Sequence, residues 1–217
     1  MSQRVPGRVS GTDRSVDRLI NFSDAVVAVA VTVLVLPLLD ISGPGEGESV
    51  WTVVGSHASQ VWTFIFTFYV VAVMWLAHNR ILNSIRRYDA FIFWINTTWL
   101  ACIVLLPWVS SMFGESEWGR TSVGMLYWGT MAAIAFLGSL LGWHLRRHPR
   151  LLADDAPVLT PSDQRRVGLR GPVIGVFFLI IGFASVAAPA VASWLPLGII
   201  PLSIWLRPAA EGVSGEV

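Results

Sequence analysis

The sequence contains little charge and almost no cysteine. Only 13% of its 217 residues are charged and 54% are hydrophobic, whereas a soluble domain usually carries about 25% charged residues. The single cysteine, Cys102, excludes a disulfide within the chain and a cysteine-based metal site. Lysine is absent, so the 15 basic residues are all arginine. This composition predicts an integral membrane protein.

The sequence also lacks the patterns of several functional classes. No cleavable signal peptide is evident, because the first apolar run is too long and has no small-residue cleavage site in the right place. No nucleophile–base pair, phosphate-binding loop or pair of intramembrane carboxylates is present, which argues against an enzyme. No histidine has a cysteine or carboxylate at metal-ligand spacing. We therefore expect no cofactor, no resident metal and no nucleic-acid partner.

Six apolar segments divide the chain, and each is interpreted as a membrane-crossing helix. The first five are long enough to cross a hydrocarbon core of about 30 Å at about 1.5 Å per residue. The sixth is short and contains Pro196 and Pro201. The predicted spans cover residues 16–39, 50–77, 88–113, 118–145, 167–188 and 190–206. The expected fold is an all-α integral membrane protein with six transmembrane helices per subunit.

Arginines gather in alternate connections between the predicted spans. These are the N-terminal tail, the 80–87 and 146–166 connections and the C-terminal end, whereas the other loops carry mostly Asp and Glu. Cytoplasmic loops of membrane proteins collect arginine. We therefore predict a multi-pass protein of the cell membrane with both termini cytoplasmic. A transmembrane domain over residues 16–207 would then lie between cytoplasmic tails at 1–15 and 208–217.

The first predicted span combines an apolar stripe with an acidic residue. On a helix with about 100° per residue, one side collects Phe22, Val26, Val29, Val33 and Leu36. Asp24 points to the opposite side. It is also poorly spaced for pairing with Arg18 on the same helix, because residues three or four apart are the ones that meet. A carboxylate at membrane depth needs a polar partner, so we expect Asp24 to find one on another helix.

The end of the second predicted span supplies candidate partners for Asp24. Its polar and aromatic side chains at the same cytoplasmic depth are Trp75, His78, Asn79 and Arg80. We interpret these residues, with Arg18, Phe22, Ser23 and Asp24, as a polar clasp between the first two helices. The alternative is that Ser23 and Asp24 only cap the start of the first helix.

Residues in the first half of the chain resemble a known family. Arg18, followed after three residues by Phe22-Ser23-Asp24, is similar to the R-x-x-x-F-S-D signature of the lysosomal/endosomal potassium channel family, transmembrane protein 175, in its bacterial branch. Trp75-x-x-His78-Asn79-Arg80 resembles that family's W-x-x-H-[HN]-R pattern. Asn96 and the "LLPW" run at 105–108 resemble its third-span pattern. The resemblance covers about residues 16–113.

The resemblance implies a potassium-favouring cation channel assembled as a homotetramer in the lipid bilayer. First helices of this family line a central pathway narrowed by apolar rings, which can also act as a hydrophobic gate. The matching positions here are Val29, Val33 and Leu36, with Thr32 beside them. Valine replaces the larger residues that are commoner in the family at the first two positions, so a wider constriction is expected. The permeant ion would be K⁺.

Two further interpretations remain open. The first is a proton-coupled or other secondary cation transporter in which Asp24 and His78 relay charge. Transporters usually show internal repeats and broken helices at mid-membrane, and this sequence shows neither, which favours a channel. The second concerns a thin polar line on the second span, Ser59, Thr63 and Thr67, which is more typical of hydrogen bonds between helices than of a pathway. His78 itself is interpreted mainly as a hydrogen-bonding residue, with a proton sensor and a metal ligand as alternatives.

Small residues repeat at helical spacing in the later spans. Gly138-x-x-x-Gly142 and Gly171-x-x-x-Gly175 place two glycines on one face of each predicted helix. Such faces let helix backbones approach closely in membranes. We therefore expect these glycines to lie at contacts between helices.

Overall fold

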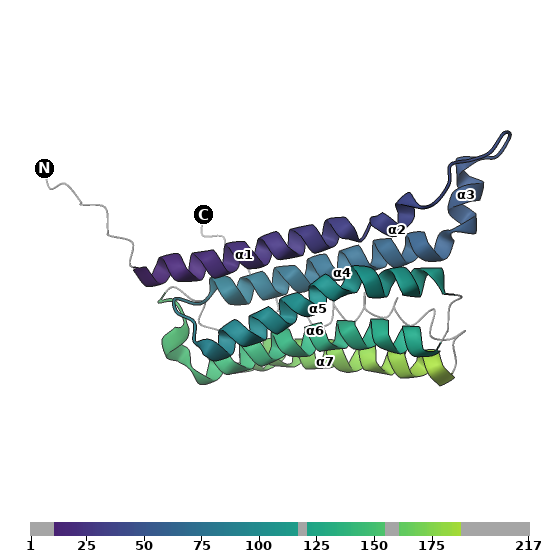
Figure 1. The fold of residues 1–217 in the computed structure, drawn as a ribbon. Coiled ribbons are helices and arrows are strands. Elements are labelled where there is room, and N and C mark those ends of the chain that lie inside the picture. The colour runs from purple at the N-terminus through teal and green to yellow at the C-terminus, as the bar shows by residue number, and fades with distance from the viewer. Residues whose placement is uncertain (1–10, 117–120, 155–160, 188–217) are drawn as a thin grey trace, which may run out of the picture.

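The computed structural model describes residues 11–116, 121–154 and 161–187, and these residues form a bundle of long helices (Figure 1). The long helices are α1 (Gly11–Val33), α4 (Ala58–Asn83), α5 (Ala90–Glu115), α6 (Thr121–Arg147) and α7 (Pro161–Ala187). The short elements are α2 (Leu36–Leu39), α3 (Val50–Ser56) and the 3₁₀ turn η1 (Pro149–Leu151). Within the described residues, 5 helical stretches are long and apolar enough to cross a membrane.

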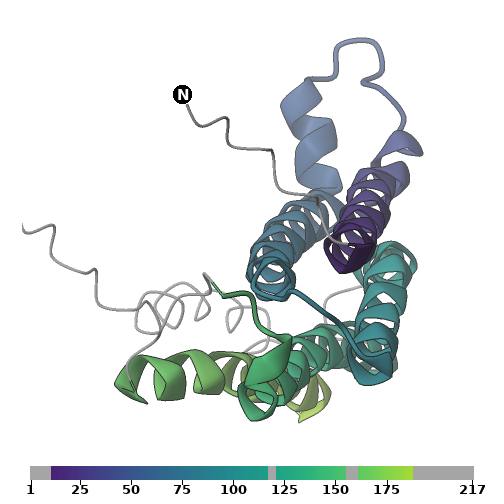
Figure 2. The same cartoon turned by 90° about the vertical axis from the view of Figure 1, so that its left-hand side faces the viewer.

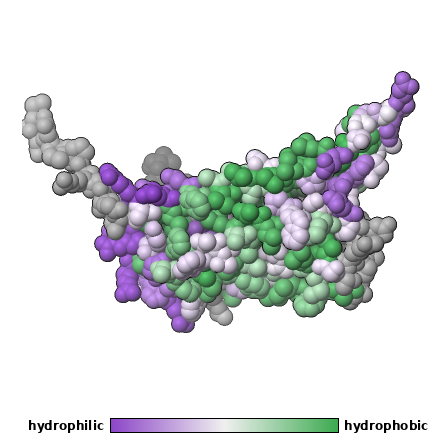
Figure 3. All heavy atoms as spheres, in the orientation of Figure 1, coloured by the Kyte–Doolittle hydropathy of each residue, from purple (hydrophilic) through white to green (hydrophobic). Residues whose placement is uncertain are grey.

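The chain runs back and forth along the bundle. The starts of α1, α5 and α7 and the ends of α4 and α6 lie together at one end (Figure 1). Hydrophilic residues collect there, whereas apolar side chains cover the middle of the bundle (Figure 3). We call this the arginine-rich end; its described arginines include Arg14, Arg18, Arg86, Arg87, Arg147 and Arg150. The separation of polar ends from an apolar middle is that of a membrane-embedded bundle.

The first predicted span is not one continuous helix. α1 ends at Val33, residues 34 and 35 form a turn, and α2 begins at Leu36. Pro37 explains the break, because proline lacks an N–H and its ring clashes with the carbonyl four residues earlier, here that of Val33. At the other end, α1 begins at Gly11, inside the segment predicted as an N-terminal tail.

The second predicted span, residues 50–77, divides into two helices. α3 is separate, and it turns away from the axis of α4 (Figures 1 and 2). The break lies at His57, whose backbone leaves the helical region at φ −110° and ψ 24°. The membrane-crossing helix is therefore α4, which begins at Ala58 and continues to Asn83, six residues beyond the predicted end.

The later predicted spans match helices within a few residues, except that α7 begins six residues early. Asp89 sets the start of α5, because its carboxylate accepts a hydrogen bond of 2.9 Å from the Ile92 N–H. In α7 the membrane-crossing part is Gly168–Val186. The sixth predicted span, residues 190–206, and the predicted C-terminal tail, residues 208–217, lie outside the described residues.

α5 joins the two halves of the bundle. Viewed along the helices, it lies between the α1–α4 pair and the α6–α7 pair (Figure 2). The core around it contains the fully buried side chains of Trp99, Ile103, Met131 and Phe178. A Cβ added at Gly175 would lie 2.7 Å from the Phe136 ring of α6. The α7 glycine pattern is thus a helix-packing face, as predicted.

Candidate functional site

α1 has one buried face and one exposed apolar face. Its buried positions recur every three or four residues at Val16, Leu19, Ser23, Val27, Ala30 and Leu34. On the other side, Phe22 and Val29 are 59% and 63% exposed. An apolar face exposed on a single subunit of a membrane protein is available to lipid or to another copy of the chain.

Asp24 is held by α4 through three hydrogen bonds. The Trp75 indole N–H donates to its Oδ1 at 2.7 Å, and the Asn79 amide donates to both carboxylate oxygens at 3.0 and 3.2 Å. Trp75 and Asn79 lie one helical turn apart, so both reach the same carboxylate. Within the described ranges Asp24 makes no ion pair. Neutral donors on α4 therefore hold the carboxylate, and they fix the rotation of α1 about its axis.

A second buried network lies beside the first. The Ser23 hydroxyl donates to the Leu19 carbonyl at 2.8 Å and accepts from the Asn96 amide at 3.0 Å. The Asn96 carbonyl oxygen accepts from His78 Nε2 at 2.8 Å. These three side chains are each no more than 3% exposed. Ser23, Asn96 and His78 thus connect α1, α5 and α4 in the interior.

His78 is further fixed by stacking. Its ring lies parallel to the Trp99 indole, with an interplanar angle of 2° and ring centroids 3.8 Å apart. In the part of the chain that the structure describes, its Nδ1 has no hydrogen-bond partner. Asp24 and His78 belong to separate networks, so the structure provides no direct contact for a charge relay between them.

Three residues predicted as members of the clasp do not take part in it. Arg18, Phe22 and Arg80 are exposed, and the two arginines make no hydrogen bond or ion pair with the side chains that the structure describes, those of residues 14–116, 122–154 and 168–187. Long arginine side chains near helix ends extend toward the polar interface, which accounts for their position. The capping alternative for Ser23 and Asp24 is also wrong, since both lie inside α1, which begins at Gly11.

Asn96 is the network residue that sequence reasoning missed. The sequence indicates Asn96 only through the family pattern and not as a link between Ser23 and His78. A physical signal was present, because an amide inside an apolar membrane span is costly unless it finds hydrogen-bond partners.

The predicted constriction residues lie on the exposed side of α1 and α2. Val29 and Val33 are exposed on α1, and Leu36 is exposed after the break, on α2. Thr32 is also exposed, but its hydroxyl donates to the Val29 carbonyl at 2.7 Å. The exposed stripe therefore offers mainly methyl groups, together with the oxygen of the Thr32 hydroxyl, whose proton is donated to the backbone.

The polar line on α4 is buried within the subunit. Thr63 and Thr67 are 4% and 0% exposed. The Thr67 hydroxyl contacts the Tyr127 hydroxyl of α6 at 2.6 Å and donates to the Thr63 carbonyl at 2.7 Å. Among the described residues, the side-chain oxygens of Ser59 and Thr63 have no partner. This line is an interhelical contact with two unused hydroxyls.

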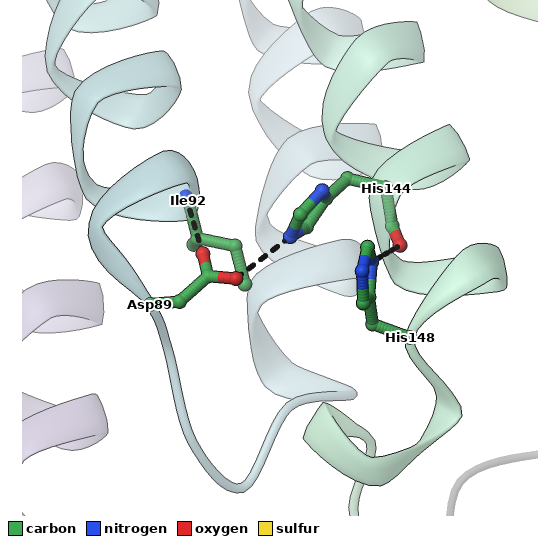
Figure 4. A network of polar contacts seen from close by, with 4 residues as sticks. All are labelled: Asp89, Ile92, His144 and His148. Atoms are coloured by element: carbon green, nitrogen blue, oxygen red, sulfur yellow. Dashed lines mark hydrogen bonds and ion pairs between the residues drawn. The ribbon is translucent and has the colours of Figure 1, made fainter.

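A third polar cluster joins α5 to α6 at the arginine-rich end (Figure 4). Asp89 contacts His144 Nε2 at 2.8 Å, and His148 Nδ1 donates to the His144 carbonyl at 3.0 Å. Burial raises the pKa of Asp89, but the Ile92 N–H and His144 together outweigh it, so this pKa lies below its usual value. The cluster lies at the start of α5, about two helical turns before Asn96.

Residues 18–107 match the sequence model of the family described as "Endosomal/lysosomal potassium channel TMEM175". The predicted family resemblance is confirmed. Because the TMEM175 family consists of ion channels, the prediction that the chain is not an enzyme is confirmed as well. The match includes both polar networks and the exposed stripe of α1.

Two bacterial relatives extend the TMEM175 likeness beyond the matched segment. A potassium channel from Streptomyces collinus is 28% identical over 174 residues, which cover 77% of this chain and 82% of that one. A potassium channel from Chamaesiphon minutus is 28% identical over 190 residues, covering 84% and 88%. An endosomal/lysosomal proton channel TMEM175 from Danio rerio is 24% identical, and this chain spans 40% of its length.

The fold is also that of a solved TMEM175 structure. The crystal structure of a lysosomal potassium-selective channel TMEM175 homolog from Chamaesiphon minutus superposes with a TM-score of 0.71 at 20% identity. The match covers 90% of this chain and 100% of that one. Together with the apolar helices, this likeness identifies a multi-pass membrane protein.

Proposed function

We propose that the chain is one subunit of a passive, potassium-favouring cation channel in the cell membrane. Four copies would surround a central pathway lined by α1. The observation that carries this proposal is the two-sided character of α1: polar contacts from Ser23 and Asp24 fix its buried side, which leaves Val29 and Val33 exposed on the other. Relatives named as potassium channels support the choice of ion.

The proposed constriction acts through dehydration. Rings of Val29 and Val33 side chains provide no oxygen ligands, whereas the Thr32 hydroxyl between them donates its proton to the Val29 carbonyl and keeps its oxygen lone pairs. An ion that enters a ring narrower than its hydration shell must lose water without replacement. Potassium holds its water less tightly than sodium, so the barrier favours potassium modestly. Apolar rings can also empty of water and so close the pathway.

Proton permeation is a second candidate, favoured by the vertebrate relatives that are named proton channels. A continuous file of water through the α1 rings would conduct protons without a titrating side chain. The transporter alternative is less well supported, because Asp24 and His78 bond to different partners.

Single-channel recording of purified protein in planar bilayers tests the proposal. With potassium on one side of the bilayer and sodium on the other, wild type should show discrete single-channel currents. Their reversal potential should indicate a higher permeability for potassium than for sodium. Val29→Ala, Val33→Ala, Leu36→Ala and Val29→Asn should raise conductance and reduce discrimination together. Ion flux at the low rate of a transport cycle, without discrete channel currents, would indicate a transporter. A reversal potential that follows the proton gradient would indicate proton permeation.

A suitable control lies outside the stripe and on the surface. Val27 is unsuitable because it is only 4% exposed, so its truncation would leave a cavity. Val104 on α5 is 56% exposed, and Val104→Ala should change neither current nor selectivity. If all stripe variants match wild type, α1 does not form the constriction. The pathway must then be sought along Ser59, Thr63 and Thr67.

A further inference from the structure

α3 runs across the bundle and not along it. It lies at the end opposite the arginine-rich end, where it turns away from the axis of α4 (Figure 1). The view along the long helices shows α3 from its side (Figure 2). Because the long helices cross the membrane, a helix that lies across them runs roughly parallel to the membrane surface. α3 therefore has the orientation of a helix in the membrane–water interface.

The two ends of α3 are defined by its own residues. Ser49 caps the start, because its hydroxyl accepts a hydrogen bond of 3.2 Å from the Trp51 N–H. At the other end the helix stops at His57, whose Nδ1 contacts the Val53 carbonyl at 3.0 Å. α3 is thus a separate short helix and not a bent first turn of α4.

The side chains of α3 separate into an apolar face and a polar face. At about 100° per residue, the apolar ones fall within about 160° of one another. They are Val50, Trp51, Val53 and Val54, whereas Thr52 and Ser56 lie on the opposite side. Every residue of α3 is described and none is buried. Trp51 and Val50 are 81% and 60% exposed, so the apolar face is available to a partner.

Exposed tryptophans lie near the membrane boundary at this end of the bundle. Trp62 on α4 and Trp108 on α5 are 42% and 59% exposed. At about 1.5 Å per residue, they lie about 6 Å from the start of α4 at Ala58 and about 10.5 Å from the end of α5 at Glu115. Tryptophan gathers at membrane–water interfaces. Because α3 runs across the bundle from the start of α4, Trp51 extends this aromatic belt.

The charges beside α3 are acidic. Residues 41–57 contain Glu46 and Glu48 and no arginine or lysine. Amphipathic helices that are drawn to anionic lipids carry basic residues on the polar face, and α3 carries none. Residues 42–49, which lead into α3, are exposed. The chemistry of this segment therefore fits the apolar boundary of a neutral lipid surface and not an anionic headgroup.

We propose that α3 lies in the boundary between headgroups and acyl chains of the bilayer, with Trp51 as its anchor. Val50 and Val54 would face the acyl chains, and Thr52 and Ser56 would face water. The partner is the lipid surface itself, and a neutral phospholipid is sufficient. The proposal depends on the membrane placement of the chain and not on its being a channel.

Fluorescence quenching of the full-length chain in phosphatidylcholine nanodiscs tests the proposal. Single cysteines at Val54 or Thr52, in a Cys102→Ser background, carry the same environment-sensitive dye. Both positions are exposed, so neither dye enters the core. The Val54→Cys probe should emit at shorter wavelength and be quenched by a lipid nitroxide at a shallow acyl position. The Thr52→Cys probe, on the other face of the same helix, should be quenched by aqueous iodide instead.

Trp51→Ser tests the anchor. In the Val54→Cys chain it should reduce quenching by the lipid nitroxide and increase quenching by iodide. Trp94→Ser is the matched control, because Trp94 is 64% exposed near the start of α5, at the arginine-rich end. It should leave both kinds of quenching unchanged. Both side chains are exposed, so neither substitution leaves a cavity in the core.

Three results would overturn the proposal. Equal iodide quenching at Val54 and Thr52 would place α3 in water. A Val54→Cys probe that is shielded from both quenchers would show that protein covers the apolar face, either a second copy of the chain or another segment of it. Lipid quenching that stays unchanged in Trp51→Ser would exclude Trp51 as the anchor.

Discussion

The side-chain amide of Asn79 donates to both carboxylate oxygens of Asp24, at 3.0 and 3.2 Å. With the Trp75 indole N–H at 2.7 Å, this contact fixes the rotation of α1 against α4 and leaves Val29 on the opposite side. The same carboxylate therefore both holds two helices together and determines which face of α1 is presented outward.

Asp24→Ala should destabilise the subunit. It leaves the Trp75 and Asn79 donors without their acceptor, and hydrogen bonds to charged groups are worth about 1.5–3 kcal/mol each. Because the carboxylate is only partly buried, water can replace part of these bonds, so we expect an overall loss of about 2–3 kcal/mol, below their sum, and a shifted size-exclusion profile in detergent. A stable oligomer of normal size that has lost potassium selectivity would instead identify Asp24 as an ion site.

Arg18→Ala is the matched comparison for Asp24→Ala. The sequence placed Arg18 in the clasp, but its exposed side chain makes no contact with Asp24 in the structure. Stability of the subunit should therefore change by less than about 0.5 kcal/mol. If Arg18→Ala instead weakens only the oligomer and not the single subunit, Arg18 makes its contacts between subunits.

Asn96→Leu should remove the hydrogen-bonded connection between Ser23 of α1 and His78 of α4. The substitution leaves Ser23 and His78 without their shared partner in the interior, at a cost of about 1–3 kcal/mol. Thermal unfolding in detergent measures it, with Thr97→Val as the control, since Thr97 is exposed on the same helix. Equal stability of both variants would show that the Ser23–Asn96–His78 network is not structural.

Asp89 should make the joint between α5 and α6 sensitive to acid. Its pKa is lowered in the folded state, so its charged form stabilises the protein above its unfolded pKa of about 3.9. That contribution disappears as the pH falls through the lowered folded value. Asp89→Asn keeps the helix cap and removes the charge.

Comparison of wild type with Asp89→Asn at neutral pH and near pH 3 provides the test. At neutral pH the variant should be less stable by no more than about 1 kcal/mol, because the carboxylate is partly exposed. The difference in the free energy of unfolding between the two proteins should be smaller near pH 3. A difference that grows on acidification would contradict a lowered pKa of Asp89 in the folded state.

Cysteine labelling in intact cells tests the predicted orientation. Cysteines placed at Ser49 and Ser116 should react with an impermeant reagent from outside, whereas one at Ser162 should react only after permeabilisation. The reason is that arginine-rich connections remain cytoplasmic. Outside labelling at Ser162 would refute a topology with both termini inside.

Periodicity and charge predicted most of the described fold but not its breaks. The predicted spans 88–113 and 118–145 differ from α5 and α6 by no more than three residues at either end. The reason is that each of these helices is one long apolar run bounded by polar residues. The break after Val33 was missed although Pro37 is visible in the sequence, since the apolar run continues through it. The separate α3 was missed because residues 50–56 are as apolar as the membrane-crossing helix that follows.

Side-chain partners were less predictable than helices. The need of Asp24 for a partner on another helix followed from the cost of an unpartnered carboxylate at membrane depth, and Trp75 and Asn79 meet it. Which nearby polar groups would be used did not follow. Arginine side chains near helix ends can extend to the membrane–water interface instead of pairing with Asp24. Asn96 joins the network only because α5 packs beside α1.

The polar contacts of Ser23 and Asp24 lie within a single turn of α1, whereas the buried positions beyond them are the apolar side chains of Val27, Ala30 and Leu34. Hydrogen bonds are directional and apolar contacts are not, so a tilt of α1 would turn about Ser23 and Asp24. At about 1.5 Å per residue, Val29 lies about 7.5 Å and Val33 about 13.5 Å beyond Asp24 along the helix. Such a tilt therefore displaces Val33 nearly twice as far as Val29.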